Sequence, residues 1–341
     1  MDTIQEKDIR DFVASFPLKD ELTDAVFLIT GATGLIGSTL IKCLLSIDKN
    51  INVIAPVRNK AKAESILNKW IERITIIECD ILSFDYDKVG KIDYIVHCAA
   101  PTSSKFFVEC PVETFNTIYQ GTYSLLEFAR RSQIKSFVYL SSLEVYGSVY
   151  DDSCLVTEEV SADLDVLSIR SSYPMAKRAT ENLCCLYCYE YHIPVKIARL
   201  TQTTGAGITK DDNRVIAQFA RLVAEGKDII LHTTGESARP YCYLTDAVSA
   251  ILFILLKGIS GEAYNVANED TYISAKDMAY YLVAHFAPTV NVRMELNDNM
   301  GYAPVTKLRL SSQKLKDLGW KPQYGLDDIF KRLIEYLKCQ V

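Results

Sequence analysis

A tyrosine and a lysine stand four residues apart in 173-YPMAK-177, a spacing that puts both side chains on one face of a helix. An ammonium group beside a phenol favours the phenolate, which lowers the pKa of the tyrosine from about 10 toward neutrality. Such a tyrosine can take the proton of a sugar hydroxyl during hydride transfer. The pair therefore predicts Tyr173 as an acid–base group and Lys177 as its activator.

The same spacing recurs in 272-YISAK-276, so spacing alone does not identify the chemical pair. There Ser274 is predicted to cap a helix, and Tyr272 and Lys276 to lie at the surface. Tyr173, in contrast, begins a helix that follows the strand ending in 140-LSSLEVYG-147. Position in the fold therefore favours the pair at Tyr173.

Two serines lie at the end of that strand. Ser141 and Ser142 stand at the carboxyl end of a predicted central strand, where α/β proteins place their ligands. A hydroxyl there can share a hydrogen bond with the substrate oxygen that Tyr173 deprotonates. The alternative is that the two serines only cap the strand.

Three glycines, Gly31, Gly34 and Gly37, follow the apolar strand 26-VFLIT-30 and precede the helical segment 38-STLIKCLLS-46. Glycines at such a junction let the backbone approach a pyrophosphate, and the helix N-terminus offers free N–H groups and a favourable dipole. The alternative is a plain strand-to-helix turn, for which one glycine is expected to suffice. Strand, glycines and helix together predict a bound dinucleotide.

Composition and charge exclude other classes of function. The formal net charge of −6 argues against a nucleic-acid partner, because phosphate binding needs clustered Lys and Arg. The N-terminal segment MDTIQEKDIR lacks the apolar core of a signal peptide, and the longest apolar stretch, 250-AILFILL-256, is too short to span a bilayer. We therefore expect a cytoplasmic protein with no membrane contact.

Ten cysteines raise the question of disulfides and metals. A disulfide framework is typical of short secreted chains, which this chain does not resemble. The cluster 184-CCLYC-188, followed by His192, contains a CxxC spacing, but it lies in a helical pattern without a second cysteine pair of ligand spacing. We predict reduced, packed cysteines and no metal, with a metal at this cluster as the alternative.

These candidate residues need a scaffold, and the first two thirds of the chain alternate between strand-like and helix-length segments. The strand-like runs are mostly continuous in their apolarity, as in strands buried on both faces. They cover residues 26–30, 52–57, 74–80, 93–99, 136–142 and 194–200. Amphipathic helices are expected between them, for example at 113–132 and 174–192. This alternation predicts an α/β fold with a doubly wound parallel sheet of the Rossmann type.

Three regions are expected along the chain. Residues 1–22 are predicted to form a helical extension, residues 23–200 the dinucleotide-binding domain, and residues 201–341 a smaller substrate-binding lobe. Part of 240–270 is expected to return to the first domain. A C-terminal helix is predicted over 326–338.

The motifs together resemble those of the extended short-chain dehydrogenase/reductase family of nucleotide-sugar epimerases, dehydratases and decarboxylases. The resemblance runs from about residue 24 to the C-terminus and is carried, in the family's order, by TGATGLIG, 97-HCAAP-101, SSLEVYG, YPMAK, 239-RPYCYLTDA-247, 264-YNVAN-268 and 318-LGWKP-322. It is closest in kind to UDP-glucuronate decarboxylases and UDP-glucose 4-epimerases. It implies an NAD-dependent enzyme acting on a nucleotide sugar, and a homodimer joined through helices 113–132 and 174–192.

The resemblance implies a role for each matching position. Tyr173 would be the catalytic base, Lys177 would also bind the nicotinamide ribose, and Ser142 would contact the hydroxyl being oxidised. The positions implied to bind the cofactor are Gly31, Thr33, Gly34, Leu35, Ile36, Gly37, Asp80 near the adenine, Ile81, Ala99, Ala100, Tyr173 and Lys177. Those implied to bind the nucleotide sugar are Pro101, Ser142, Gln202, Arg214 and Arg239, the two arginines through the diphosphate.

Two departures from the family pattern bear on the ligands. The second strand ends in 55-APVRN-59, without the acidic residue that would hydrogen-bond a ribose 2′-hydroxyl. Arg58 at this place suits a 2′-phosphate, so NADP is an alternative to NAD. Family members that regenerate their cofactor nevertheless usually keep NAD bound. Gln202 stands where the family often has Asn.

Glu144 bears on the reaction. Similar dehydratases and decarboxylases carry Glu at this position, whereas simple 4-epimerases tend to have a small residue. A carboxylate above the sugar can remove a proton next to a ketone, once oxidation has made that proton acidic. Leu143 departs from both patterns, since dehydratases have Asp there and decarboxylases usually a hydroxyl. The alternative is a structural carboxylate that points away from the sugar.

The predicted reaction therefore passes through a transient 4-keto sugar, with Ser142, Glu144, Tyr173 and Lys177 as catalytic residues, and is of the dehydratase or decarboxylase type. 4-Epimerisation is the first alternative. Arg58 would suit a reductase that uses NADPH once and releases it. A non-catalytic dinucleotide sensor is a further alternative, although such sensors commonly lose the tyrosine or the lysine.

Overall fold

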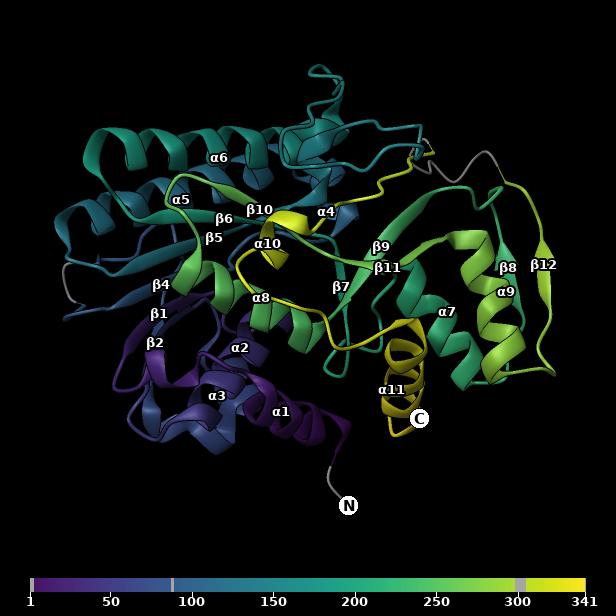
Figure 1. Cartoon of the computed structure of the whole chain (residues 1–341), viewed down its shortest axis with the longest axis horizontal. Helices are drawn as coiled ribbons and strands as arrows, with labels where there is room; N and C mark the ends of the chain where they lie inside the picture. Colours follow the sequence, from purple (N-terminus) through teal and green to yellow (C-terminus); the bar gives the residue numbers. More distant parts are fainter. Residues whose placement is uncertain (1–2, 87–88, 298–304, 341) are drawn as a thin grey trace.

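The structure, a computed structural model, describes residues 3–86, 89–297 and 305–340. Its centre is a seven-stranded sheet in the order β10-β6-β5-β4-β1-β2-β3, and its neighbouring strands are parallel (Figure 1). The strand order reverses between β1 and β4, which confirms the predicted doubly wound sheet. The strands are β1 (Val26–Thr30), β2 (Asn52–Val57), β3 (Ile74–Glu78), β4 (Tyr94–His97), β5 (Ser136–Ser142), β6 (Val195–Leu200) and β10 (Ala263–Val266).

The apolar runs of the sequence became strands because both faces of the sheet are covered. Every side chain of β4 is buried, and in β5 only the last residue, Ser142, is partly exposed. The strands predicted over 74–80 and 93–99 are shorter in the structure, because their last residues leave the sheet as loops at its carboxyl edge. These loop residues are therefore available for a ligand.

Helices cover both faces of the sheet (Figure 1). On one face, α2 (Leu35–Ile47) and α8 (Leu244–Lys257) share a core with β1. On the other, α5 (Pro111–Arg131) and α6 (Ser172–Tyr191) pack against each other over a second core. Pro174 lies in the first turn of α6, as predicted. Among the described residues, no helix has both the length and the apolarity to cross a membrane.

A smaller lobe with its own core follows the sheet. It contains a three-stranded sheet, β11-β9-β7, and a strand pair, β12-β8. These strands are β7 (Gln202–Thr204), β8 (Ile229–Leu231), β9 (Ala238–Tyr243), β11 (Asn268–Ser274) and β12 (Val292–Met294). Its helices are α7 (Val215–Ala224), α9 (Ala275–Phe286) and the predicted C-terminal helix, α11 (Leu326–Lys338). Between β9 and β11 the chain returns to the first domain, where β10 pairs with β6.

Short elements at the carboxyl edge of the sheet complete the fold. They are the helix α4 (Ser104–Glu109) and the 3₁₀ turns η4 (Leu143–Tyr146) and η5 (Ile169–Ser171). The remaining short elements are α3 (Lys60–Leu67), α10 (Gln313–Lys316) and the 3₁₀ turns η1 (Lys19–Leu22) and η2 (Asn68–Arg73).

The N-terminal helix α1 (Ile4–Ser15) contacts both domains. Its apolar face buries Phe12 in the core shared with α2 and α8. Its Asp8 forms an ion pair with Arg332 of α11 and accepts a hydrogen bond of 2.5 Å from the Tyr243 hydroxyl at the end of β9. The helical extension of the sequence is therefore a connection between the two domains.

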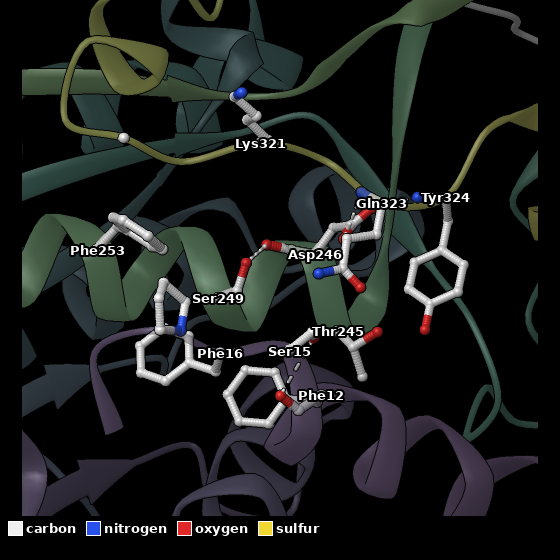
Figure 2. A pocket seen from close by; sticks show the side chains of 12 residues that line it. Phe12, Ser15, Phe16, Thr245, Asp246, Ser249, Phe253, Lys321, Gln323 and Tyr324 are labelled. Carbon is white, nitrogen blue, oxygen red and sulfur yellow. Dashed lines mark hydrogen bonds between the residues drawn. The ribbon is translucent and has the colours of Figure 1, made fainter. Parts of the chain in front are cut away.

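Phe12 of α1 and Phe16, the residue that follows this helix, also line a cavity of about 160 Å³ (Figure 2). The Phe12 and Phe16 rings stack with centroids 5.2 Å apart, and Phe16 meets Phe253 of α8 edge to face at 5.8 Å. Opposite them lie residues 319–324 and the buried Asp246, which accepts backbone N–H bonds from this segment. The C-terminal end of the chain thus closes over α1 and α8.

Candidate active site

The turn between β1 and α2 contains the three glycines. Gly31 has a φ of +68°, and a Cβ there would lie 2.7 Å from the carbonyl carbon of Cys98. A Cβ on Gly37 would lie 2.3 Å from the carbonyl oxygen of Gly31. Close packing of the turn therefore requires two glycines by itself, so the expectation that a plain turn needs one is wrong.

Gly34 has a different environment, because it is exposed and a Cβ there would meet only the Gly31 carbonyl oxygen, at 3.2 Å, among the described atoms within 4 Å. It is the N-cap of α2, and no described side chain caps this helix. The first turn, with the half-exposed Leu35 and Ile36 and the neighbouring Thr33, keeps its N–H groups for an anion. The turn fits the pyrophosphate of a dinucleotide.

A buried histidine fixes the end of β4. Nδ1 of His97 lies 2.6 Å from the Thr30 hydroxyl, and Nε2 lies 3.1 Å from the Thr122 hydroxyl. Thr122 donates its own proton to the carbonyl one turn earlier in α5, so it accepts from Nε2–H, and Nδ1 accepts from Thr30. Burial lowers the pKa of His97 to about 3, so the ring is neutral. Thr30 also accepts from the N–H of Ala99, which holds the loop that continues with Ala100 and Pro101.

The expected adenosine side lies at the ends of β2 and β3. These strands pair in parallel, so Arg58 and Asp80, which follow them, stand at the same edge of the sheet, and both are exposed. The Asp80 carboxylate accepts a hydrogen bond of 2.9 Å from the N–H of Leu82. Ile81 lies against α5, where a Cβ on Gly121 would meet it at 3.4 Å. The guanidinium of Arg58 has no ion-pair partner among the described residues.

Tyr173 and Lys177 face the end of β5 from the first turns of α6. Lys177 donates a hydrogen bond of 2.6 Å to the carbonyl of Leu140, and its Nζ lies 5.7 Å from the centroid of the Tyr173 ring. Burial lowers the pKa of Lys177 to about 8, so the ammonium form prevails at neutral pH. The same ammonium lowers the pKa of Cys98, which burial raises to about 12, and this places the pair next to the glycine turn.

The predicted lowering of the Tyr173 pKa is wrong for the protein chain alone. Tyr173 is only 8% exposed, and this burial raises the pKa of its phenol. The Glu144 carboxylate raises it further, while the Ser142 hydroxyl and Arg170 lower it. Desolvation of the phenolate therefore outweighs the nearby cations. The same result shows that Ser142 and Glu144 lie close to Tyr173.

Ser142 caps the turn that follows β5. As the N-cap of η4, its Oγ accepts a hydrogen bond of 3.2 Å from the N–H of Glu144. Because the hydroxyl accepts this bond, its own proton is available to a substrate oxygen. Ser141 is 4% exposed, and its Oγ has no hydrogen-bond partner among the described residues.

Two residues that the sequence reasoning missed join this group. Arg170 of η5 forms an ion pair with Glu144, with Nη2 lying 3.0 Å from Oε2. Phe107 of α4 stacks on Tyr173 with centroids 4.2 Å apart and an interplanar angle of 10°. Arg170 stands three residues before Tyr173, but no spacing in the sequence relates it to Glu144. Tertiary packing brings Glu144 to Arg170 and Phe107 to Tyr173.

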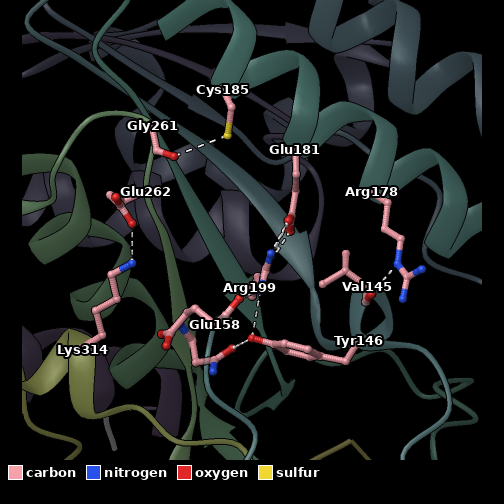
Figure 3. Close-up of polar contacts among 11 residues, drawn as sticks. Val145, Tyr146, Glu158, Arg178, Glu181, Cys185, Arg199, Gly261, Glu262 and Lys314 are labelled. Atoms are coloured by element: carbon pink, nitrogen blue, oxygen red, sulfur yellow. Dashed lines mark hydrogen bonds and ion pairs between the residues drawn. The ribbon is translucent and has the colours of Figure 1, made fainter. Parts of the chain in front are cut away.

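A polar network fixes the last two residues of η4, Val145 and Tyr146 (Figure 3). Arg199 of β6 pairs with Glu181 at 2.7 Å and donates to the Tyr146 hydroxyl at 3.1 Å. Tyr146 in turn donates to Asn265 of β10 at 2.6 Å. Arg178 donates to the carbonyl of Val145, the residue after Glu144, at 2.6 Å. The turn that carries Glu144 is therefore fixed at its far end by two arginines.

The three predicted substrate residues of the second lobe converge on Tyr241. Gln202 pairs with Tyr241 across β7 and β9, and both Arg214 and Arg239 lower the pKa of Tyr241, which burial raises to about 12. The Oε1 atom of Gln202 is buried without a partner among the described residues. Arg214 is already engaged, because it pairs with Asp212 at 2.6 Å and donates to a backbone carbonyl. Among the residues that the structure describes, the Arg239 guanidinium donates one hydrogen bond, a long one of 3.4 Å, to the Thr306 hydroxyl.

The second tyrosine–lysine pair lies in the other lobe. Ser274 caps α9, as predicted, by accepting from the N–H of Asp277 at 3.0 Å. Lys276 is exposed, whereas Tyr272 is half-buried and donates to Asp152 at 2.8 Å. The carboxylate and burial raise the pKa of Tyr272.

The cysteines of α6 are packed thiols. All ten cysteines of the chain are free, and Cys184 is buried in the core under α5 and α6. Burial raises the pKa values of Cys184, Cys185 and Cys188. Within the described ranges, no group of three or more His, Cys, Asp or Glu side chains is arranged to hold a metal ion.

Comparison with known sequences places this site in context. The sequence model of the NAD dependent epimerase/dehydratase family matches residues 27–267. UDP-glucuronic acid decarboxylase 6 of Arabidopsis thaliana is 28% identical over 303 residues, which cover 88% of this chain and 84% of the relative. The dTDP-D-glucose 4,6-dehydratase of Dictyostelium discoideum is 31% identical over 278 residues, covering 78% of this chain and 63% of that protein.

Solved structures share the fold at lower identity. UDP-glucuronic acid 4-epimerase from Bacillus cereus, in complex with UDP-glucuronic acid and NAD, superposes with a TM-score of 0.79 at 22% identity, covering 93% of this chain and 100% of that one. RMD from Pseudomonas aeruginosa, complexed with NADPH, superposes with a TM-score of 0.74 at 22% identity, covering 93% and 100%. At this identity the likeness shows the fold alone.

Proposed function

Since the chain belongs to the NAD dependent epimerase/dehydratase family, we propose that it converts a nucleotide-diphosphate sugar through a transient 4-keto intermediate, by a reaction of the dehydratase or decarboxylase type. The observation that carries this proposal is the position of Glu144, whose carboxylate acts on the pKa of Tyr173 and is held by an ion pair with Arg170. A 4-epimerase needs no second carboxylate beside its tyrosine.

Each residue of the group has a part in the proposed reaction. Tyr173 takes the proton of the C4 hydroxyl, and Ser142 donates a hydrogen bond to the same oxygen. Lys177, whose ammonium lies 5.7 Å from the centroid of the Tyr173 ring, would offset part of the cost of desolvating the phenolate. The glycine turn and the uncapped N-terminus of α2 would hold NAD, which would supply the hydride acceptor that the 4-keto intermediate requires.

Glu144 acts after C4 has become a ketone, because only then is the bond at C5 weakened. In elimination, Glu144 takes the C5 proton and passes it to the departing C6 hydroxyl, which leaves as water. In decarboxylation, carbon dioxide leaves from C5, its bonding electrons pass into the 4-ketone, and C5 then receives a proton. In the proposed function Glu144 is the acid–base group for either proton transfer.

Glu144→Gln tests the choice of reaction, because it keeps size and hydrogen bonding but removes the base. We expect the first hydride transfer to survive and product formation to fall by about 10²–10⁴-fold. The reduced cofactor should then persist, which its absorbance reports. A variant that turns over its substrate at nearly the wild-type rate would make 4-epimerisation the leading function.

The substrate is identified by mass. The purified protein is incubated separately with UDP-glucuronic acid, UDP-glucose and dTDP-glucose, and the mass of each sugar nucleotide is then measured by mass spectrometry. Loss of water identifies a dehydratase and loss of carbon dioxide a decarboxylase, while a product of unchanged mass that separates from the substrate by chromatography identifies an epimerase. Conversion of none of these three sugars would oppose the proposal.

We also propose a homodimer formed through α5 and α6. These helices expose Tyr123, Leu186 and Tyr189, the last to 87%, on their outer side. Large apolar side chains on two adjacent helices are typical of a surface that another chain covers. Leu186→Glu should then convert the dimer to a monomer in sedimentation experiments, and a wild-type monomer would contradict the proposal.

A further inference from the structure

The ion pair between Arg170 and Glu144 lies at the open edge of the site. Nη2 of Arg170 is 3.0 Å from one carboxylate oxygen and 3.2 Å from the other, and the two side chains are 35% and 32% exposed. Pairs exposed to this degree contribute little to stability. The main effect of the pair is therefore on the position of the Glu144 carboxylate.

The guanidinium of Arg170 has a second contact. Its Cζ lies 5.1 Å from the centroid of the Phe107 ring, and this ring is stacked on Tyr173. Phe107 is only 2% exposed, and its carbonyl accepts a hydrogen bond of 2.9 Å from the Ser172 hydroxyl at the start of α6. A buried ring fixed to α6 thus defines where both Arg170 and Tyr173 lie.

These contacts form a closed circuit. From Tyr173 it passes through Phe107 to Arg170, and from Arg170 to Glu144. The N–H of Glu144 is bonded to Ser142, whose hydroxyl acts on Tyr173. The five residues come from three separate stretches of the chain, which are α4, the β5–η4 junction and the η5–α6 junction. Displacement of one member therefore changes the relation between Glu144 and Tyr173.

We propose that Arg170 is a positioning residue, which holds the Glu144 carboxylate beside Tyr173 and, through the Phe107 ring, fixes the two groups relative to each other. The role rests on the proposed function, in which Tyr173 acts first and Glu144 second on the same sugar ring. The Glu144 side chain extends from a short 3₁₀ turn. Its carboxylate has no hydrogen-bond partner other than Arg170 among the described residues. Arg170 selects the rotamer that keeps the carboxylate at the site.

The test compares Arg170→Met, Arg170→Lys and a control, Arg178→Met, using whichever of UDP-glucuronic acid and dTDP-glucose the wild type converts. Arg178 supports the same turn, but its hydrogen bonds within the described part of the chain go to backbone carbonyls. In Arg170→Met we expect KM and the first hydride transfer to stay within a few-fold, while product formation falls by about 10–10²-fold because the base is misplaced. Arg170→Lys should recover part of this loss. In Arg178→Met both steps should fall together, since its effect is on the whole turn.

A substrate-free measurement separates this role from the proposed function. Glu144 of the intact protein is labelled with a carbodiimide and an amine, and the rate is followed by mass spectrometry of its peptide. Arg170→Met should be labelled several-fold faster than the wild type, because its carboxylate has lost its partner. Equal rates would overturn the positioning role whichever sugar is converted, and so would an equal loss in both steps of turnover. Faster labelling without conversion of either sugar would support the contact and oppose the proposed function.

Discussion

Two arginines of this molecule combine the same kinds of partner in different surroundings. The Arg170 cluster consists of Arg170, Glu144, Phe107 and Tyr173 at the edge of the candidate site. The Arg332 cluster consists of Arg332, Asp8, Asp11 and Tyr324, where α1 meets α11. In both, a guanidinium pairs with a carboxylate and lies near an aromatic ring, at 5.1 Å for Phe107 and 4.6 Å for Tyr324.

Burial separates the two clusters. The side chains of Arg332 and Asp8 are 16% and 5% exposed, whereas those of Arg170 and Glu144 are 35% and 32% exposed. Removing one partner of a buried pair leaves an uncompensated charge and destabilises a protein by about 3–5 kcal/mol. Breaking a half-exposed pair changes stability by roughly 0–1 kcal/mol. The buried Arg332 cluster therefore connects the two domains, whereas the half-exposed Arg170 cluster is open to a ligand.

The largest effect that we expect is the loss of turnover when Tyr173 of the Arg170 cluster is replaced. Tyr173→Phe removes only the hydroxyl that takes the substrate proton, so turnover should fall by about 10²–10⁴-fold while the fold and cofactor binding persist. Steady-state rates with the accepted sugar, together with a cofactor titration, measure this. Tyr272→Phe is the control for the choice of tyrosine, and a large loss there would mean that the other pair is catalytic.

Tyr243→Phe is the matched change in the Arg332 region. It removes the hydrogen bond of 2.5 Å to Asp8 and should destabilise the fold by about 1–3 kcal/mol, because a buried carboxylate loses a donor. Turnover per folded molecule should be unchanged. If Tyr243→Phe lowered turnover as strongly as Tyr173→Phe, the division of the two clusters into structure and chemistry would be wrong.

The next effect concerns stability. Arg332→Met should lower the free energy of unfolding by about 3–5 kcal/mol, since Asp8 remains buried without its cation. Arg170→Met should lower it by no more than about 1 kcal/mol. Urea unfolding followed by circular dichroism measures both. Equal losses in the two variants would show that exposure does not distinguish the clusters.

How far the sequence predicts these clusters depends on the range of the contacts. Tyr173 and Lys177 share a helix face, and the glycines of the β1–α2 turn are neighbours in the chain, so local spacing identifies them. Arg170 and Glu144 are 26 residues apart, and their pairing depends on how η4 and η5 pack. The amphipathic pattern of residues 1–22 predicts a helix, but the pairing of Asp8 with an arginine 324 positions later has no local signal.

The pKa of Tyr173 illustrates a second limit. Charge counting at the sequence level predicts a lowered value, because Lys177 lies one turn away. The structure adds the desolvation of a phenol that is 8% exposed and the charge of Glu144, and both act in the opposite direction. Spacing therefore gives the partners of a group but not its burial. Burial decides the sign here.

A third arginine extends the comparison to an exposed position and to an effect on cofactor affinity alone. Arg58 follows β2 at the edge where the adenosine ribose is expected, next to the exposed Lys60 and Lys62. A guanidinium in this place suits a 2′-phosphate, so NADP should bind the emptied protein at least as well as NAD.

Arg58→Ala should weaken the binding of NADP by about 1.5–3 kcal/mol, the range of a charge-assisted hydrogen bond, and leave the binding of NAD unchanged. Lys62→Ala removes a nearby exposed cation and should change the affinity for NADP much less. Calorimetric titration of both dinucleotides measures these affinities. If NAD alone is recovered from the purified protein and Arg58→Ala leaves the affinities for both dinucleotides unaltered, Arg58 is a surface residue without a role in cofactor choice.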